Sequence, residues 1–249
     1  KLAQASRMKS EFIGVVSHQL RSPLTNLRWG LDFLVGESPG RTAEELSYFQ
    51  ILKENTARMN ELVNDLLTVS RIDEGKFPFQ KKEFEFVEVV QNVLTEFQSL
   101  IQATNVEVKV EGEQIPQMFS DPGLVRHVVA NLLDNAIRYT RKEQGAVRTE
   151  KQENSKITIR YRKKNEHLYA EIQDNGVGIP KEDQKYIFQK FFRSRNAIRH
   201  QTQGSGLGLY IVRSLLERAG GEIGFESGEN KGSTFWFTLP LTSAPKQGK

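Results

Sequence analysis

The hydrophobic positions of the chain change their spacing near residue 75. Before that point, apolar residues recur every three or four positions, which predicts two amphipathic helices. The first stripe consists of Phe12, Val16, Leu20, Leu24, Leu27, Leu31 and Leu34, and the second of Phe49, Leu52, Thr56, Met59, Val63 and Leu66. Glycines and a proline at 36–40 indicate a loop between them, and Thr42 with Glu45 forms a capping box at the second start.

The two stripes are narrow, close to the heptad seam of a coiled coil. One helical hairpin cannot bury such a seam alone, so we expect two chains to pair into a dimeric four-helix bundle. Packing of the hairpin onto the rest of the chain is the alternative. The fold class of this first part is therefore an all-α helical hairpin.

Beyond residue 75, alternating strand-like segments and helical segments follow one another. The predicted helices are 86–103, one that starts at Asp121 with Pro122 in its first turn, and 207–219. The predicted strands are 77–86, 105–110, 156–163, 167–172, 222–226 and 233–239. This order indicates an α/β sandwich, a mixed sheet with helices on one face. We expect domains at 1–74 and 75–241, a polar loop at 141–155 and a tail at 242–249.

Composition narrows the functional classes. The net charge of +4 comes from 35 basic and 31 acidic residues spread along 249 positions, so no nucleic-acid partner is expected. The absence of cysteine excludes disulfides and thiolate metal sites and fits the cytoplasm. No apolar run is long enough to span a membrane. Because the chain starts at Lys1, we expect it to be a fragment. A membrane anchor in the preceding part stays open as an alternative, and the chain would then be the cytoplasmic part of a membrane sensor.

The stretch SHQLRSPL places His18 on the polar side of the first helix. His18 is two residues from both Val16 and Leu20, so it projects away from the seam. A neutral imidazole there can act as a nucleophile, although a surface histidine without a role is the alternative. Pro23 removes the hydrogen bond to the carbonyl of Gln19, and we interpret it as a hinge beside His18.

Two glycine-rich segments suggest a phosphate site. DNGVGIP follows a predicted strand directly, and GSGLGL opens a predicted helix. Each alone is weak, since ordinary turns look the same, and neither fits a Walker A or Rossmann pattern. Asn131 and Asn135 share one face of a helix, which suits Mg²⁺ held with phosphate oxygens, whereas capping or surface asparagines are the alternative.

Taken together, these segments resemble a two-component sensor histidine kinase. SHQLRSPL is similar to the phosphoacceptor box, NLLDNAIRYT to the N box, DNGVGIP to the first glycine box, IFQKFF to the F box and GSGLGL to the second glycine box. The closing KGSTFWFTLP also looks like the family's last hairpin. The resemblance implies a HisKA dimerisation domain followed by a GHKL (Bergerat) ATP-binding fold.

The resemblance also implies roles for particular residues. His18 would attack the γ-phosphate of ATP, and the phosphoryl group would pass to an aspartate of a response regulator receiver domain. Gln19 and Ser22 complete the expected catalytic set, Asn135 would hold Mg²⁺, and 193–203 would be a mobile lid. The residues expected at the nucleotide are Asn131, Asn135, Arg138, Tyr139, Asp174, Gly176, Gly178, Ile179, Arg193, Gly204, Ser205, Gly206, Leu207 and Gly208.

Three positions distinguish a histidine kinase from the alternative functions, an ATPase clamp and a degenerate kinase. Related ATPase clamps carry a water-activating glutamate where this chain has Asn131, and an amide cannot take a proton. Gln19 replaces the family's usual acid and Ser22 its usual threonine or asparagine, so kinase activity is expected to persist and regulator phosphatase activity stays open. The alternative is a degenerate kinase that acts as a dimeric scaffold or phosphatase for a response regulator.

Overall fold

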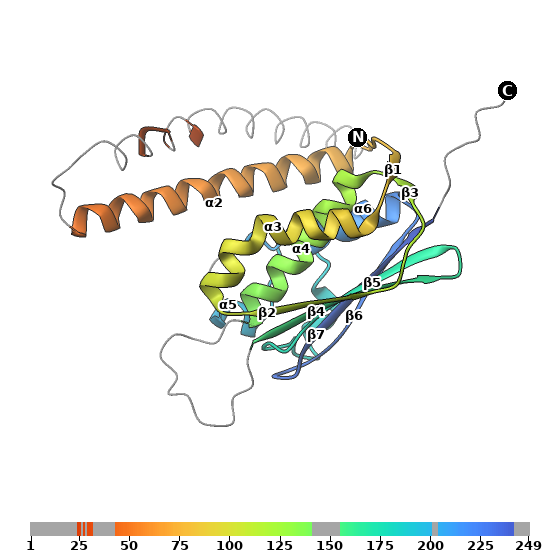
Figure 1. Cartoon of the computed structure of the whole chain (residues 1–249). Helices are drawn as coiled ribbons and strands as arrows, with labels where there is room; N and C mark the ends of the chain where they lie inside the picture. Colours follow the sequence, from red (N-terminus) through yellow and green to blue (C-terminus); the bar gives the residue numbers. More distant parts are fainter. Residues whose placement is uncertain are drawn as a thin grey trace. The chain divides into compact units, whose positions relative to one another are not determined.

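The computed structural model describes residues 24, 25, 27, 29–31, 43–140, 155–200 and 204–241. The chain divides into two compact units, Lys1–Phe77 and Pro78–Lys249, and Figure 1 draws both. This division lies close to residue 74, where the change of hydrophobic spacing places the boundary. No helix in the described ranges combines the length and the apolarity that a membrane crossing needs.

The first unit is helical where it is described. Residues 24, 25, 27 and 29–31 are helical, and α2 runs from Ala43 to Asp73, which confirms the predicted second helix. Thr56 and Val63 of the predicted seam are buried, whereas Leu52 and Met59 remain 51% and 48% exposed. Part of the predicted seam of α2 is therefore exposed in the described residues.

A glycine ends α2. Gly75 adopts a φ of 73°, a left-handed conformation that glycine reaches without strain. The backbone N–H of Lys76 donates to Arg71 O at 2.9 Å and that of Gly75 to Ile72 O at 3.0 Å. These two bonds form a Schellman motif and satisfy carbonyls of the last turn.

The second unit is built on a five-stranded mixed sheet. Its strands lie in the order β2-β4-β5-β7-β6, and only the β2–β4 pair is parallel. The bounds are β2 Glu107–Gly112, β4 Lys156–Lys164, β5 His167–Asp174, β6 Glu222–Gly228 and β7 Gly232–Pro240. A separate two-stranded sheet pairs β1 (Lys82–Phe84) with β3 (Met118–Ser120).

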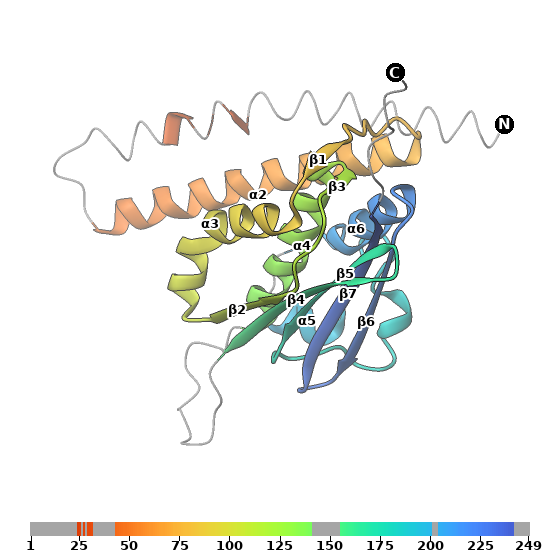
Figure 2. The same cartoon turned by 45° about the vertical axis from the view of Figure 1, so that its right-hand side comes forward.

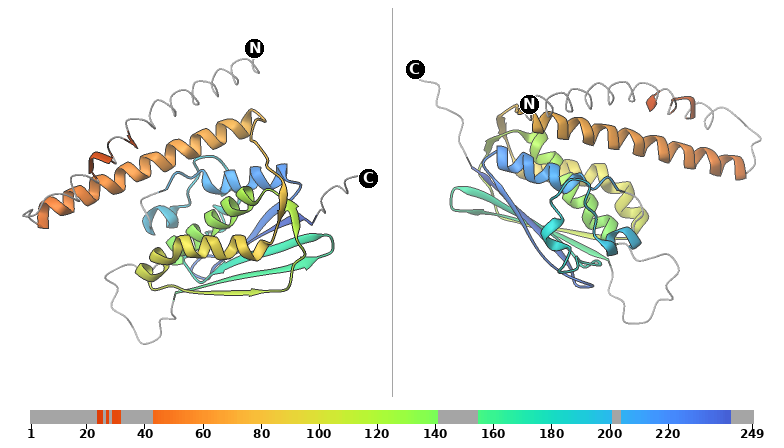
Figure 3. Two further views of the ribbon diagram at one scale, coloured as in Figure 1. Left: turned by 45° about the horizontal axis from the view of Figure 1, so that its top comes forward. Right: turned by 180° about the vertical axis from the view of Figure 1, so that it is seen from behind.

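The larger helices lie on one face of the five-stranded sheet. They are α3 (Phe86–Thr104), α4 (Pro122–Thr140) and α6 (Gly208–Arg218), and Figures 1, 2 and 3 show them on the same side. The side chains that face them form the core, in which Val90, Leu133, Leu168 and Leu215 are fully buried. The predicted sandwich with helices on one face is confirmed.

The sequence prediction failed at the entry to this unit. A strand was predicted over 77–86, but only Lys82–Phe84 pairs, with β3 as its partner. The alternation of phenylalanines at 77–86 imitates a long strand, but the strand β1 covers only Lys82–Phe84 of this range. The short elements β3, η1 (Gln184–Tyr186) and α5 (Arg195–His200) carry no periodic pattern and were not predicted.

Asp121 fixes the start of α4. Its Oδ1 accepts hydrogen bonds from the backbone N–H groups of Gly123 (2.8 Å) and Leu124 (3.2 Å), as expected of an N-cap. Its Oδ2 accepts one from the N–H of Gln80 at 2.8 Å. One buried carboxylate therefore holds both the helix and the segment that enters the unit.

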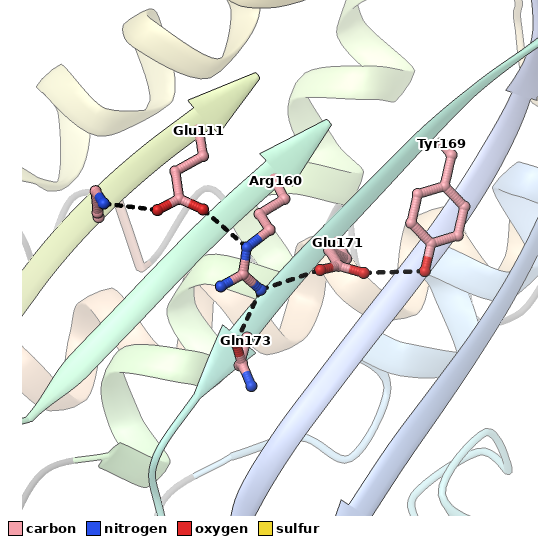
Figure 4. A network of polar contacts seen from close by, with 6 residues as sticks. Glu111, Arg160, Tyr169, Glu171 and Gln173 are labelled. Carbon is pink, nitrogen blue, oxygen red and sulfur yellow. Dashed lines mark hydrogen bonds and ion pairs between the residues drawn. The ribbon is translucent and has the colours of Figure 1, made fainter. Parts of the chain in front are cut away.

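A polar network crosses the sheet face opposite the helices (Figure 4). Arg160 on β4 lies at its centre and donates to Glu111 on β2 (2.9 Å) and to Glu171 on β5 (3.1 Å). It also donates to Gln173 at 2.9 Å, and Tyr169 donates to the far oxygen of Glu171 at 3.0 Å. The network ties three strands together on their solvent side.

Replacing Arg160 by methionine should lower the free energy of unfolding of the second unit by about 1 kcal/mol, the upper range for exposed ion pairs, because three partners lose a shared donor. The loss should shrink in 1 M NaCl, where such pairs are screened. Denaturant unfolding at low and high salt measures it.

Arg126→Met is the matched control, since Arg126 pairs with a single carboxylate, Glu96, between α3 and α4. Its effect should be smaller than that of Arg160→Met. Equal losses for the two variants, or a loss independent of salt, would contradict the network interpretation.

Candidate functional site

Asp174 is a buried carboxylate at the end of β5. It is 7% exposed, and its Oδ1 accepts hydrogen bonds from the N–H of Gly176 (2.8 Å) and the N–H of Ser233 (3.3 Å). Within the described part of the chain, its Oδ2 has no hydrogen-bond partner. Burial raises the pKa of Asp174 to about 6. The hydrogen bonds from the two N–H groups favour the charged form and lower the pKa, but burial has the larger effect. The group is therefore an acceptor that remains available to a ligand.

The first glycine box is locked into one backbone conformation. Gly178 has a φ of 63°, and a Cβ there would overlap the carbonyl oxygen of Gly228. The N–H of Val177 donates to Tyr139 O at 3.2 Å, and the N–H of Ile179 donates to Ser227 Oγ at 2.9 Å. The loop is thus held between the end of α4 and the β6–β7 hairpin.

Helix α4 presents two amides to the same side. Asn131 and Asn135 are half-buried and one turn apart, and neither side chain makes a hydrogen bond within the described ranges. An amide oxygen without a protein partner is a suitable Mg²⁺ ligand, because this ion binds few protein oxygens and retains waters. The described residues contain no cluster of three or more His, Cys, Asp or Glu side chains that could hold a metal ion. Asn135 fits the expected single protein ligand.

Arg138 is engaged within α4. Its Nε donates to Asp134 Oδ2 at 2.6 Å, in an i,i+4 ion pair whose side chains are about one-third exposed. The family resemblance implies that Arg138 faces the phosphates. In the structure, this ion pair holds the guanidinium beside Asp134, one turn back along the helix.

The second glycine box brings the start of α6 to α4. Gly208 lies so close to Asn131 that a Cβ at Gly208 would overlap the amide oxygen. Gly206 has a φ of 67° and packs against the backbone of Phe191 and Phe192. Leu207 is buried, and its N–H donates to Ser205 Oγ at 3.2 Å. The N box and the second glycine box therefore meet at one point.

Arg193 lies beside the same box. A Cβ on Gly204 would come within 3.4 Å of the Arg193 guanidinium. Residues 195–200 of the segment predicted as a mobile lid form the helix α5, and 201–203 lie outside the described residues. His18, Gln19, Ser22 and Pro23 also lie outside the described residues, so the structure does not test the roles expected for them.

Several residues around the site escaped the sequence analysis. The hydroxyl groups of Ser233 and Ser227 form a hydrogen bond of 2.9 Å, and the backbone N–H of Ser233 donates to Asp174 Oδ1. Asn196 donates from Nδ2 to Gly178 O at 2.6 Å. Their positions depend on strand register and loop packing, which leave no local signal in the sequence.

Two family models match the chain. The His Kinase A (phospho-acceptor) domain matches residues 8–75, and the model of the histidine kinase-, DNA gyrase B-, and HSP90-like ATPase matches residues 120–243. Together they span most of the chain, in the order that the sequence motifs indicate. The chain belongs to the two-component sensor histidine kinases, of which it carries a phosphoacceptor segment and an ATPase-type domain.

Curated relatives agree with this family. The sensor histidine kinase GacS of Pseudomonas protegens is 31% identical over 96% of this chain, which spans 25% of GacS. The circadian input-output histidine kinase CikA of Synechococcus elongatus is 30% identical over 96% of this chain, which spans 31% of CikA. The chain thus spans between a quarter and a third of the length of these relatives.

Solved structures share the fold. Full-length ShkA in complex with AMPPNP has a TM-score of 0.74 at 23% identity, covering 94% of this chain and 46% of ShkA. The catalytic domain of histidine kinase ThkA has a TM-score of 0.54 at 30% identity, covering 65% of this chain and 96% of that domain. ThkA in complex with the response regulator TrrA has a TM-score of 0.61 at 24% identity, covering 93% of this chain and 61% of that chain.

The pKa of Asp174 predicts how nucleotide affinity depends on pH. Only the carboxylate form can accept a hydrogen bond at both oxygens. If Asp174 accepts a hydrogen bond from the nucleotide, its protonation removes that acceptor. ADP affinity should be constant above about pH 7 and fall as pH drops through the Asp174 pKa of about 6. The fall should approach about tenfold per pH unit at lower pH. Calorimetric titration with ADP in excess Mg²⁺ between pH 8 and pH 5 measures it.

His127→Gln is the control for this experiment. Burial and the neighbouring Arg126 lower the pKa of His127, so this half-buried side chain of α4 is a second group that titrates in acid. The variant should keep the pH dependence of the parent chain. Constant affinity down to pH 5, or loss of the pH dependence in His127→Gln, would show that Asp174 does not control binding.

Proposed function

We propose that this chain uses ATP to phosphorylate His18 and then passes the phosphoryl group to an aspartate of a response regulator receiver domain. The observation that carries the proposal is Asp174, whose Oδ2 is left for a ligand while Oδ1 is held by two backbone N–H groups. This arrangement suits an adenine amino group. The ATPase-type family match over the same region supports the same ligand.

The proposed reaction has two displacements at phosphorus. A nitrogen of the His18 imidazole attacks the γ-phosphorus, the bond to the bridging β,γ-oxygen breaks, ADP leaves, and the imidazole gives up its proton. The regulator's aspartate then attacks the phosphorus of phosphohistidine, the phosphorus–nitrogen bond breaks, and an acyl phosphate forms. The leaving imidazole nitrogen takes up a proton, which restores neutral histidine. Both steps require alignment and charge stabilisation more than covalent chemistry from the ATP-binding domain.

The residues of the second unit fill the remaining roles. Gly176 and Gly178 shape the loop against the base, and the N-terminus of α6 at Gly206, Leu207 and Gly208 favours phosphate. Mg²⁺ held by Asn135 would neutralise phosphate charge. Asn131 is an amide and cannot act as a base toward water, which suppresses hydrolysis and leaves the phosphoryl group for His18.

The partners proposed are a second copy of the chain and a response regulator. The half-exposed Leu52 and Met59 of α2 fit pairing into a four-helix bundle. The fold neighbour ThkA has been crystallised with the response regulator TrrA, which supports a receiver domain as the second partner. The hydroxyl of Ser22 would orient water for removal of the regulator's phosphate, and the cytoplasm is the proposed compartment.

Incubation with γ-labelled ATP and Mg²⁺ should label the chain, and the label should be acid-labile and alkali-stable, as phosphohistidine is. His18→Gln should abolish the label, whereas His167→Gln, a half-buried histidine on β5, should keep it. Released phosphate without label would identify an ATPase clamp. Absence of both signals, with a regulator still bound, would identify the dimeric scaffold.

Gln19→Glu should raise the initial rate of His18 phosphorylation by up to about 100-fold, the lower range for a positioned general base. A carboxylate can accept the Nδ1 proton of His18, whereas an amide can accept only a hydrogen bond. Initial rates between pH 6 and pH 9 measure the gain.

Gln19→Ala is the matched control and should give no gain at any pH. Equal initial rates for the parent chain and Gln19→Glu across the pH range would show that the residue after His18 does not act as a base.

A further inference from the structure

Asn196, in the first turn of α5, makes four polar contacts with its single side chain. Its Nδ2 donates to Gly178 O at 2.6 Å and, more weakly, to Val177 O at 3.4 Å. Its Oδ1 accepts from Ser194 Oγ at 2.7 Å and from the N–H of Ala197 at 2.9 Å. The two halves of the amide therefore serve different purposes: Oδ1 closes the local turn, and Nδ2 reaches the first glycine box.

The segment around Asn196 is held at a second point. The carboxylate of Asp183 is buried, and its Oδ2 accepts from the N–H of Arg195 at 3.1 Å. Further back, the guanidinium of Arg193 packs against Gly204 of the second glycine box. Residues 193–196 thus touch both glycine boxes, which are separated by more than twenty positions in the sequence.

The first glycine box connects this segment to Asp174. Gly176 donates to Asp174 Oδ1, and two residues later Gly178 receives the bond from Asn196. The backbone between them has little freedom, because Gly178 lies in the left-handed region against the Gly228 carbonyl. A ligand that fixes Asp174 therefore also fixes the acceptor on which Asn196 depends.

We propose that Asn196 is a positioning residue that couples recognition of the adenine at Asp174 to placement of the arginines of residues 193–199. The inference rests on the proposed ATP function and adds a specificity device to it. A nucleotide with the right base orders Arg193, Arg195 and Arg199 for the phosphates, and a nucleotide without it orders them less. The base would thereby control the rate of phosphoryl transfer and not only affinity.

Amide hydrogen exchange with saturating adenosine tests the coupling, because adenosine has a base and no phosphates. In the parent chain, adenosine should slow exchange at Gly176 and also at residues 195–199. In Asn196→Asp, slowing at Gly176 should persist, whereas slowing at residues 195–199 should fall by about fivefold, the factor of one net hydrogen bond. Asn196→Asp keeps the oxygen that accepts from Ser194 and Ala197. It replaces the donor Nδ2 by a carboxylate oxygen, which repels the carbonyl oxygens of Val177 and Gly178.

Asn230→Asp is the matched control. Asn230 lies exposed on the β6–β7 hairpin, and its backbone N–H donates to the same Val177 O at 2.7 Å. The same change of amide to acid there should leave the protection of residues 195–199 intact. Exchange at β5 and β7 amides reports whether each variant keeps its sheet.

The rate of His18 phosphorylation is a second measurement, and it separates a positioning role of Asn196 from a purely structural one. Asn196→Asp should bind adenosine as tightly as the parent chain, while its rate of His18 phosphorylation at saturating ATP should fall about fivefold. Full protection of residues 195–199 in Asn196→Asp would overturn the inference alone. Failure of adenosine to protect Gly176 in the parent chain would overturn the proposed ATP function and this inference with it.

Discussion

The buried carboxylate of Asp174 is the constraint on which the site depends. It lies at the end of β5, where a charged group is costly unless hydrogen-bond donors surround it. One donor comes from the loop that follows β5, and the other comes from Ser233 on β7, the neighbouring strand. Because the folded-state pKa of about 6 exceeds the ordinary value of 3.8, the ionised carboxylate costs stability above about pH 6. The folded chain therefore holds the energetically unfavourable carboxylate charge of Asp174 at the position where a ligand can donate a hydrogen bond to it.

Helix α4 sets the distance between the two ends of the site. Near its C-terminus, the carbonyl of Tyr139 contacts the first glycine box, and Asn131 meets Gly208 of the second. Eight residues of helix separate these contacts, about 12 Å along the axis. Asp121 and the buried face of α4 fix this helix against the sheet, so the spacing of the two boxes does not depend on loop conformation. A helix of fixed length between the two contacts therefore preorganises the spacing of the two glycine boxes.

The sequence predicts most of the fold because its signals are periodic and local. The stripe of α2, the N-cap of Asp121 and the alternation of β4, β5 and β7 each reveal an element without knowledge of its neighbours. The glycine boxes were placed correctly at the ends of elements for the same reason. Three failures share one cause: the strand expected over 77–86, the unpredicted β3 and the unpredicted α5 are all decided by tertiary partners. Ser233 and Asn196 contribute to the site only through strand register and loop packing. Neither of these can be predicted from the local sequence around a single residue.

The topology of the sheet has a consequence for synthesis of the chain. The central pair joins β5 to β7, so Asp174 is completed by a donor almost sixty residues further along. Pairing over such separations forms late, since the loop must close before its contacts are gained. A ribosome-bound chain that has exposed the N box, both glycine boxes and α6 still lacks the Ser233 N–H and the hairpin under Gly178. Nucleotide would therefore be bound only after β7 has emerged, and the phosphoacceptor segment, which precedes this unit in the chain, would stay unphosphorylated until then.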